Sequence, residues 1–409
     1  MEEPRLFTFS KWDFLFTCLG LVFLLCDIVL DMWAVVTFYQ EKAYVYMGIL
    51  ICFLLVSSVI VQIYSFLWYR LDNYERRTKV EKCPNLLALM LLHVGQLGIY
   101  LRHAGYLEVS VGSFIKKGYD RDTVAYLGHD LSMLRLMETF SESAPQLGLM
   151  LTVMLQRCSV EPITVAKAFG SAAAIACSVT MYHRSLRSFL PDKKQQLICS
   201  SVIYFLWNML LIVSRLTALA LFASVQPCFI FTHFICSWLV LFFVAWRAQT
   251  NFMEGHGEWL YRATVGLIWY FSWFNVVEGR TRRRTTIYHG YILVDICLLC
   301  IFWLYSHWKH NTVPPHIKIS LLDTAISTLA VIATYVLGLL LKLIYYKFLH
   351  PQLNRPELRG SSSNGALTGA RVINSGSDVT DSFHSADVPL PVPPLLNKRM
   401  RKLAENFYY

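Results

Sequence analysis

Charged residues are scarce in this chain of 409 residues: they make up 16% of it, whereas 55% of the residues are hydrophobic and 14% are aromatic. This composition excludes a soluble globular domain and a disordered chain, because both carry more charge than this sequence has. The short segments of alternating polarity that indicate a β-barrel are also missing. Apolar runs of membrane-spanning length recur instead, and they predict an all-α, polytopic membrane protein.

Motifs for enzymatic chemistry are absent too. The sequence has no phosphate-binding loop, no H-E-x-x-H zinc motif, no G-x-S-x-G nucleophile elbow and no dinucleotide-binding glycine pattern. Its eleven cysteines have no regular spacing; Cys297 and Cys300 are spaced C-x-x-C but lie in an apolar run without histidine or acidic neighbours. We therefore predict a protein that is not an enzyme and that uses no cofactor and no metal. Any transport by it runs downhill.

The formal net charge is +10. In a membrane protein, lysine and arginine report topology, so we predict no nucleic-acid partner. Basic clusters follow the second, fifth and eighth apolar segments, and such clusters mark the cytoplasmic side. The ten apolar segments are Phe14–Phe38, Tyr44–Trp68, Leu86–Tyr106, Val124–Leu155, Ile163–Met181, Ile198–Val225, Phe229–Trp246, Leu260–Val277, Ile287–Trp308 and Leu321–Phe348.

Ten crossings would place the basic loop after the fifth segment outside, so one segment in each half must fail to cross. The best candidates are Leu86–Tyr106, which is interrupted by glycines and holds His93 and Arg102, and Leu260–Val277, which is short and aromatic. This predicts eight transmembrane helices plus two re-entrant or half-spanning helices, with both termini in the cytosol. Because the halves then share one order of elements, they are predicted as two pseudo-symmetric repeats, residues 1–183 and 184–350.

The stretch from residue 130 to residue 146 carries four charges inside an apolar segment. At about 100° per residue, Arg135, Glu138 and Glu142 share one helix face, and Asp130 lies roughly 140° away. One charge at the bilayer centre costs a few kcal/mol even on the lenient insertion scale, so these side chains must face protein, water or lipid headgroups.

Asp27 and Asp31 add two acids one turn apart on the first segment. Such charges either fix helix register as ion pairs or line a hydrophilic path for polar cargo, and Pro145 could bend its helix and open a groove. Acids outnumber nearby cations, which leaves carboxylates for choline or amine headgroups. The residues predicted for the lipid path are Asp27, Asp31, Arg102, Asp130, Arg135, Glu138, Glu142, Arg184 and Arg215.

Three functions stay open on these charges. The first is the movement of polar cargo, such as choline or amine headgroups, along a hydrophilic path. The second is a downhill transporter or channel for small solutes, which requires a continuous aqueous pathway. The third is a membrane adaptor subunit that transports nothing.

The C-terminal region changes character after residue 350. Residues 351–387 are rich in serine, glycine and asparagine, and we predict a disordered cytosolic linker. Within it, Asp378-Val-Thr-Asp381 followed by Ser382 has the D-x-x-D-small pattern of an effector-caspase site. A disordered segment is where a protease can bind an extended strand.

Residues 388–409 follow as a proline-rich spacer and a short amphipathic helix. Its apolar face consists of Leu396, Met400, Leu403 and Phe407, and the opposite face is basic. The helix can lie on the anionic inner leaflet, and a cut after Asp381 would release it together with the spacer.

Four motifs resemble the XK-related family of membrane proteins, and most of all its caspase-activated member. They are DLSMLRLMETF (Asp130–Phe140), SSVIYFLWN (Ser200–Asn208), EWLYR (Glu258–Arg262) and YFSWFNVVEGRTR (Tyr270–Arg282). The resemblance covers nearly the whole chain. It implies an ATP-independent phospholipid scramblase of the plasma membrane that exposes phosphatidylserine in apoptosis.

The same resemblance implies that charged positions of the first spans form a headgroup path or internal salt bridges, and that the tail helix blocks the cytoplasmic side until a caspase removes it. The implied partners are membrane phospholipids, an effector caspase and a single-span immunoglobulin-type glycoprotein of the basigin or neuroplastin kind. The linker around Asp378 and Asp381 looks particular to this chain, so the cleavage position is inferred from the pattern alone.

Overall fold

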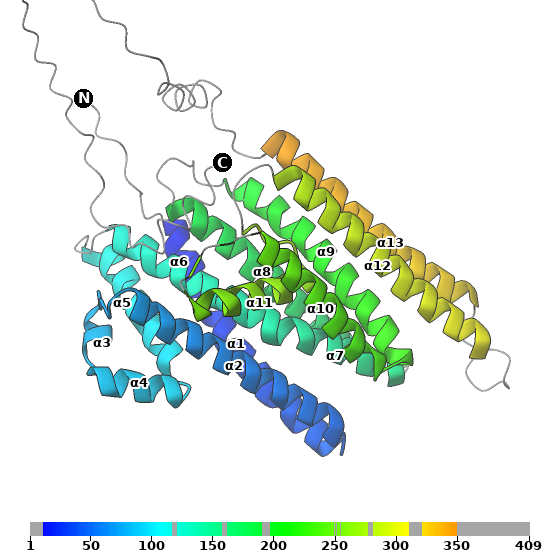
Figure 1. Cartoon of the computed structure of the whole chain (residues 1–409), viewed down its shortest axis with the longest axis horizontal. Helices are drawn as coiled ribbons and strands as arrows, with labels where there is room; N and C mark the ends of the chain where they lie inside the picture. The colour runs from blue at the N-terminus through cyan, green and yellow to red at the C-terminus, as the bar shows by residue number, and fades with distance from the viewer. Residues whose placement is uncertain are drawn as a thin grey trace, which may run out of the picture.

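The computed structural model describes residues 11–116, 121–157, 162–189, 197–248, 250, 252–253, 255–276, 281–310 and 321–349. Within these ranges the regular structure is helical, without a strand, as the sequence predicts. Most of the helices are long and run side by side (Figure 1). The long single helices are α1 (Lys11–Gln40), α2 (Tyr44–Leu71), α8 (Pro162–Phe189), α9 (Ile198–Val225), α10 (Phe229–Arg247), α12 (Thr281–His310) and α13 (Leu321–Ile344), which continues as the π-turn η2 (Tyr345–Leu349).

These seven helices are long and apolar enough to cross a membrane. They coincide with seven of the eight predicted crossing segments. The eighth, Val124–Leu155, forms α6 (Arg121–Glu138), the π-turn η1 (Thr139–Ser143) and α7 (Ala144–Arg157) in one continuous run. It does not qualify by composition, because α6 is rich in charged residues and α7 has only 14 residues.

Pro145 alters the helix geometry of this run one turn before its own position. Proline lacks a backbone N–H, and its ring clashes with the carbonyl four residues before it, which here belongs to Ser141. The helix widens into the π-turn, and the N–H of Ala144 reaches back to the carbonyl of Thr139. The structure accommodates the proline by widening one turn of the helix. The bend that the sequence suggests at Pro145 stays a prediction.

The third predicted segment is sharply bent. It consists of α4 (Leu86–Val94) and α5 (Gly98–Lys116), which meet at 117° across a break of three residues. At the tip, the Gln96 side chain accepts a hydrogen bond of 2.6 Å from Ser58, near the middle of α2. The tip therefore reaches about half the length of α2. The short helix α3 (Lys79–Lys82) precedes this pair.

The eighth predicted segment is α11 (His256–Phe271). Its 16 residues extend over about 24 Å, which is shorter than the roughly 30 Å hydrocarbon core. The helix is central: Thr264 hydrogen-bonds to Tyr64 of α2 at 2.8 Å, and Phe271 stacks on Phe140 of η1. Because α11 is buried between elements from both ends of the chain, it helps to hold them together.

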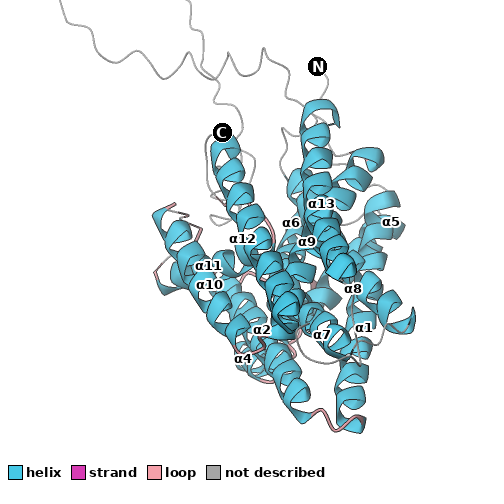
Figure 2. Cartoon of the chain, turned by 90° about the vertical axis from the view of Figure 1, so that its right-hand side faces the viewer, coloured by secondary structure: helices cyan, strands magenta, loops and turns pink. Residues whose placement is uncertain are grey.

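A single large apolar core runs through the bundle and includes Trp68, Phe140, Trp207 and Tyr288. Many large apolar side chains lie on the outside instead, where a membrane would cover them. Short loops connect neighbouring helices wherever both ends of a connection are described (Figure 2). Within this apolar bundle the charged side chains of Asp31, Arg102 and Asp130 are buried.

Candidate functional site

An acid-rich cluster lies between α1 and α6. The Arg135 guanidinium on α6 bridges two carboxylates: its Nη2 lies 2.9 Å from Asp27 of α1, and its Nη1 lies 2.8 Å from Glu138, one turn along α6. The side chains keep exposed fractions of 25% for Asp27, 20% for Glu138 and 16% for Arg135. This ion-paired group is therefore partly open at the surface of the bundle.

Two further acids complete the cluster. The carboxyl groups of Asp31 and Glu142 are buried close to each other, with Asp31 also near Gln146 and Glu142 near Ser57. Four acidic side chains therefore gather around one arginine. The cluster holds more carboxyl groups than cationic groups.

A second ion pair joins α5 to α6. The Arg102 guanidinium lies 3.4 Å from the Asp130 carboxylate, and both side chains are nearly fully buried. Arg102 also donates to the hydroxyl of Ser65 at 2.8 Å and to its carbonyl at 2.9 Å, and it stacks over the Tyr69 ring. This pair is electrically balanced and is tied to the backbone of α2.

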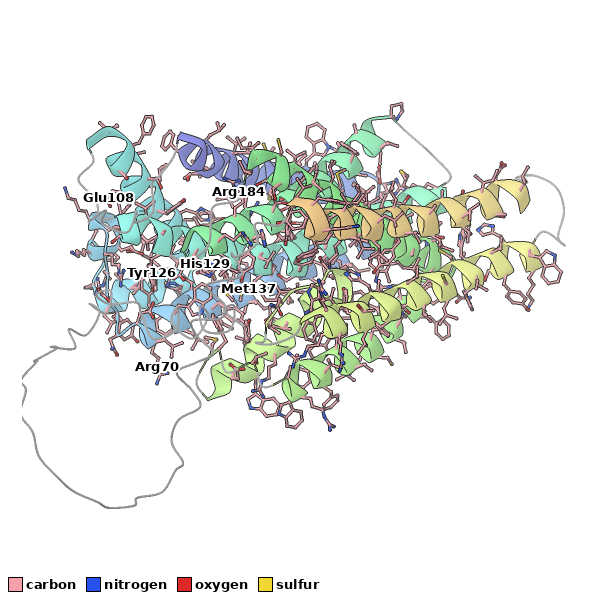
Figure 3. All side chains as sticks on the ribbon, turned by 90° about the horizontal axis from the view of Figure 1, so that it is seen from above. Arg70, Glu108, Tyr126, His129, Met137 and Arg184 are labelled. Carbon is pink, nitrogen blue, oxygen red and sulfur yellow. The ribbon has the colours of Figure 1, made fainter. Side chains whose placement is uncertain are left out.

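The α6 helix carries these charges through the bundle. Figure 3 shows Tyr126, His129 and Met137 following one another along α6 toward the middle of the bundle. Asp130 and Arg135 lie between them in sequence but face different partners, on α5 and α1. The angular separation expected from helix geometry is thus confirmed by the contacts.

A third ionic group belongs to the second half of the chain. Arg215 on α9 lies 2.5 Å from Asp295 on α12, and His233 on α10 lies 3.1 Å from the other oxygen of that carboxylate. Tyr270 on α11 offers its hydroxyl to His233 and its carbonyl to Arg215. Four helices therefore meet at this group, and the Arg215 side chain is 1% exposed.

The predicted path residues accordingly fall into separate places. Arg215 does not join the first-half acids, because Asp295 holds it, and Arg184 on α8 donates to Ser201 of α9 at 2.7 Å. Figure 3 shows Arg184 apart from the α6 residues. The cluster between α1 and α6 unites five of the nine: Asp27, Asp31, Arg135, Glu138 and Glu142.

Sequence reasoning missed two charged positions. Asp295 stands in the apolar run Ile287–Trp308, just as Asp27 stands in the first one, so the same signal could have revealed it. Lys342 is buried on α13, where its ammonium group contacts His289 at 2.7 Å and the Trp207 ring. Both lie in helices whose overall composition is strongly apolar.

The predicted caspase-site residues Asp378, Asp381 and Ser382 lie outside the described residues, as do the tail-helix residues Leu396, Met400, Leu403 and Phe407. Across the described ranges, no group of three or more histidine, cysteine, aspartate or glutamate residues is arranged to hold a metal ion.

Comparisons with known proteins cover nearly the whole chain. Residues 15–351 match the family model described as XK-related protein. The chain is 41% identical to XK-related protein 8 of Tetraodon nigroviridis, over 100% of this chain and 99% of the relative. It is 40% identical to the protein of the same name from Gasterosteus aculeatus, over 98% of each chain. The Pan troglodytes protein of that name is 35% identical, over 97% of this chain and 94% of the relative.

Proposed function

This chain belongs to the XK-related family of membrane proteins, and from that premise we propose that it is an ATP-independent phospholipid scramblase. In this proposal it acts in the plasma membrane and exposes phosphatidylserine during apoptosis. Removal of its C-terminal tail by an effector caspase activates it.

The observation that carries the proposal is the acid-rich cluster of Asp27, Asp31, Arg135, Glu138 and Glu142. A zwitterionic headgroup that crosses bare hydrocarbon loses its hydration, and this desolvation is the main barrier to lipid exchange. Partly exposed charged side chains along α1 and α6 can replace water around the headgroup. The excess of carboxylates suits the choline and amine groups of phospholipids.

The exposed fractions of the ionic groups distinguish those that could contact a lipid headgroup from those that only hold helices together. Arg215 is 1% exposed and binds Asp295 of α12 and Tyr270 of α11, which is the arrangement of a structural ion pair that fixes helices against one another. Arg135 is 16% exposed and both of its partners are more exposed than it is. We assign the path to the α1–α6 cluster and a locking role to Arg215 and Asp295.

Arg102 and Asp130 are intermediate. Both of their side chains are nearly fully buried, as the Arg215 side chain is, but Asp130 lies on α6, the helix that carries Arg135. In the proposed function they fix the position of α6 against α5 and α2. Arg184 has a polar contact between α8 and α9 and stays a candidate for the cytoplasmic end of the path.

The proposed topology follows the charge distribution. The run α6–η1–α7 crosses as the eighth span, and the bent pair α4–α5 and the short α11 reach half depth. Both termini are then cytosolic, and the two halves are pseudo-symmetric repeats. The tail helix of residues 388–409 blocks the cytoplasmic side until cleavage after Asp381 releases it.

The proposed partners are membrane phospholipids, an effector caspase and a single-span glycoprotein of the immunoglobulin type. A membrane glycoprotein of that kind would assist delivery to the cell surface.

The test uses the purified full-length chain in liposomes that carry labelled lipids in both leaflets. Loss of the outer-leaflet signal is followed before and after treatment with an effector caspase, with the Asp381→Ala variant as the matched control. We expect exchange only after cleavage, and none in the Asp381→Ala protein. Ion currents through the cleaved protein would favour a solute channel instead. Folded, cleaved protein that never moves lipids would favour an adaptor subunit.

A further inference from the structure

His93 occupies the inner face of the bent pair α4–α5. Its ring is buried, with edge contacts to Phe66 and Tyr69 of α2. Nε2 lies 2.9 Å from the Ser65 hydroxyl oxygen, and Nδ1 lies 2.8 Å from the Leu89 carbonyl, one turn earlier in α4. The ring therefore bridges its own helix and α2.

These contacts determine where the protons are. A carbonyl oxygen can only accept a hydrogen bond, so Nδ1 is protonated and donates to the Leu89 carbonyl. In a neutral ring Nε2 is then an acceptor, and the Ser65 hydroxyl donates to it. The same hydroxyl oxygen accepts from Nε of Arg102 at 2.8 Å. The result is a directed chain of hydrogen bonds from Arg102 through Ser65 to His93.

These hydrogen bonds orient the Arg102 guanidinium. Nε and Nη2 are held by the hydroxyl and carbonyl of Ser65, which leaves Nη1 facing Asp130 on α6. If the Ser65 hydroxyl rotates, the contact at Nε changes, and the guanidinium can turn away from Asp130. The Ser65 hydroxyl therefore links the His93 ring to the ion pair of Arg102 with Asp130 on α6.

Gly98 keeps the ring in place from the other side. A Cβ atom at this position would lie 2.4–2.5 Å from three atoms of the His93 ring, so any side chain there would displace it. The first residue of α5 therefore has to be glycine for His93 to reach Ser65. This close approach explains one of the glycines that interrupt the third apolar segment.

A protonated His93 does not fit these contacts. Both ring nitrogens would then donate, and the Ser65 hydroxyl would have to turn its proton away and accept from two cations at once. Nε2 of His93 and Nε of Arg102 each lie within 2.9 Å of the same oxygen, so the two positive charges would repel at short range. The acids near this point lie beyond Arg102 and Tyr69: Asp130 on α6 and Glu81 on α3.

We infer that His93 is a positioning residue whose neutral ring holds Arg102 on Asp130 through the Ser65 hydroxyl, and that protonation of the ring releases this contact. The inference about lipid movement rests on the proposed scramblase function; the inference about structure does not. Acidification is then expected to loosen the contact between the bent pair and α2 and to slow lipid exchange.

The experiment compares wild-type protein with His93→Gln at pH 7.5 and pH 5.5. The glutamine amide oxygen can accept from Ser65, but it cannot be protonated in this range. Melting temperature in detergent is the first measurement, and lipid exchange by tail-cleaved protein in liposomes is the second. His233→Gln is the matched control, because His233 is a second partly buried histidine that contacts Asp295 and Tyr270 and lies outside the contacts of the bent pair α4–α5.

We expect wild-type protein and His233→Gln to lose melting temperature on acidification and to exchange lipids at least threefold more slowly, whereas His93→Gln keeps its pH 7.5 behaviour in both measurements. Gly98→Ala should resemble acidified wild-type protein already at pH 7.5. Equal pH dependence of wild-type protein and His93→Gln would overturn the inference, and so would a His93→Gln protein that does not fold. If the melting temperatures differ as expected but no protein moves lipids at either pH, the positioning role stands and the scramblase function fails.

Discussion

We expect Asp295→Asn to reduce the stability of the protein and Glu138→Gln to reduce the rate of lipid exchange. Each change removes one negative charge while keeping the shape of the side chain and one acceptor oxygen. Asp295 is the counter-charge of Arg215, whose side chain is 1% exposed, and it also binds His233. Removal of one partner from a buried ion pair costs about 3–5 kcal/mol, because the remaining charge stays buried without compensation. We expect Asp295→Asn to lower the free energy of unfolding by that amount.

Glu138 stands in a different setting. Arg135 keeps its second partner Asp27 at 2.9 Å after the change, and both Arg135 and Glu138 are partly exposed. Partly exposed pairs contribute about 1 kcal/mol or less, so Glu138→Gln should unfold almost like the wild-type protein. If the carboxylate stabilises the passing headgroup by about 1.4 kcal/mol, its loss slows lipid exchange roughly tenfold.

Both variants are measured by denaturant or thermal unfolding in detergent and by lipid exchange of tail-cleaved protein, normalised to folded material. Glu75→Gln is the matched control, since Glu75 also pairs with an arginine, Arg77, but at 58% side-chain exposure outside the long helices. The control should change neither quantity. The assignment of a path to α1–α6 is refuted if Glu138→Gln exchanges lipids at the wild-type rate, or if its only defect is a loss of stability as large as that of Asp295→Asn.

The remaining predictions concern the helix packing and the tail. Gly338→Ala places a Cβ atom 2.8 Å from Leu211 and should destabilise the α9–α13 contact by about 1–3 kcal/mol, seen as a lower melting temperature. The paired substitution Leu403→Asp and Phe407→Asp should activate lipid exchange in uncut protein if the tail helix docks by its apolar face, and silence before cleavage would contradict that mode of docking. Asp381→Ala should yield one undigested band after caspase treatment, while a cut elsewhere would place the site at another aspartate.

The helical architecture could be read from the sequence because hydrophobic length is a local property. Seven of the predicted crossing segments are helices of sufficient length, and the glycine-interrupted segment around His93 is bent by 117°. The short aromatic segment is likewise too short to cross as a single helix. Parity of the basic clusters required one non-crossing segment in each half, and the glycines and the short length singled out these two.

Side-chain partners were predictable only where helix geometry determines them. Arg135 and Glu138 were predicted to share one helix face, and they form an ion pair at 2.8 Å one turn apart. Arg215 was grouped with the first-half acids, but Asp295 binds it from α12, 80 residues later. The sequence offers no measure of which helices become neighbours, so it could not choose between these acids.

The sequence by itself determined that this chain is a helical membrane protein of the XK-related family. It also determined that charged side chains lie in apolar segments, where they must face protein, water or lipid headgroups. The tertiary structure decided which charged side chains remain partly exposed and which are buried, because burial depends on packing between helices that are distant in sequence. It also decided that His93 faces Ser65 and Arg102, since a bend at residues 95–97 turns α4 back onto α2. Length and composition act along the chain, whereas compensation of buried charge acts between its helices.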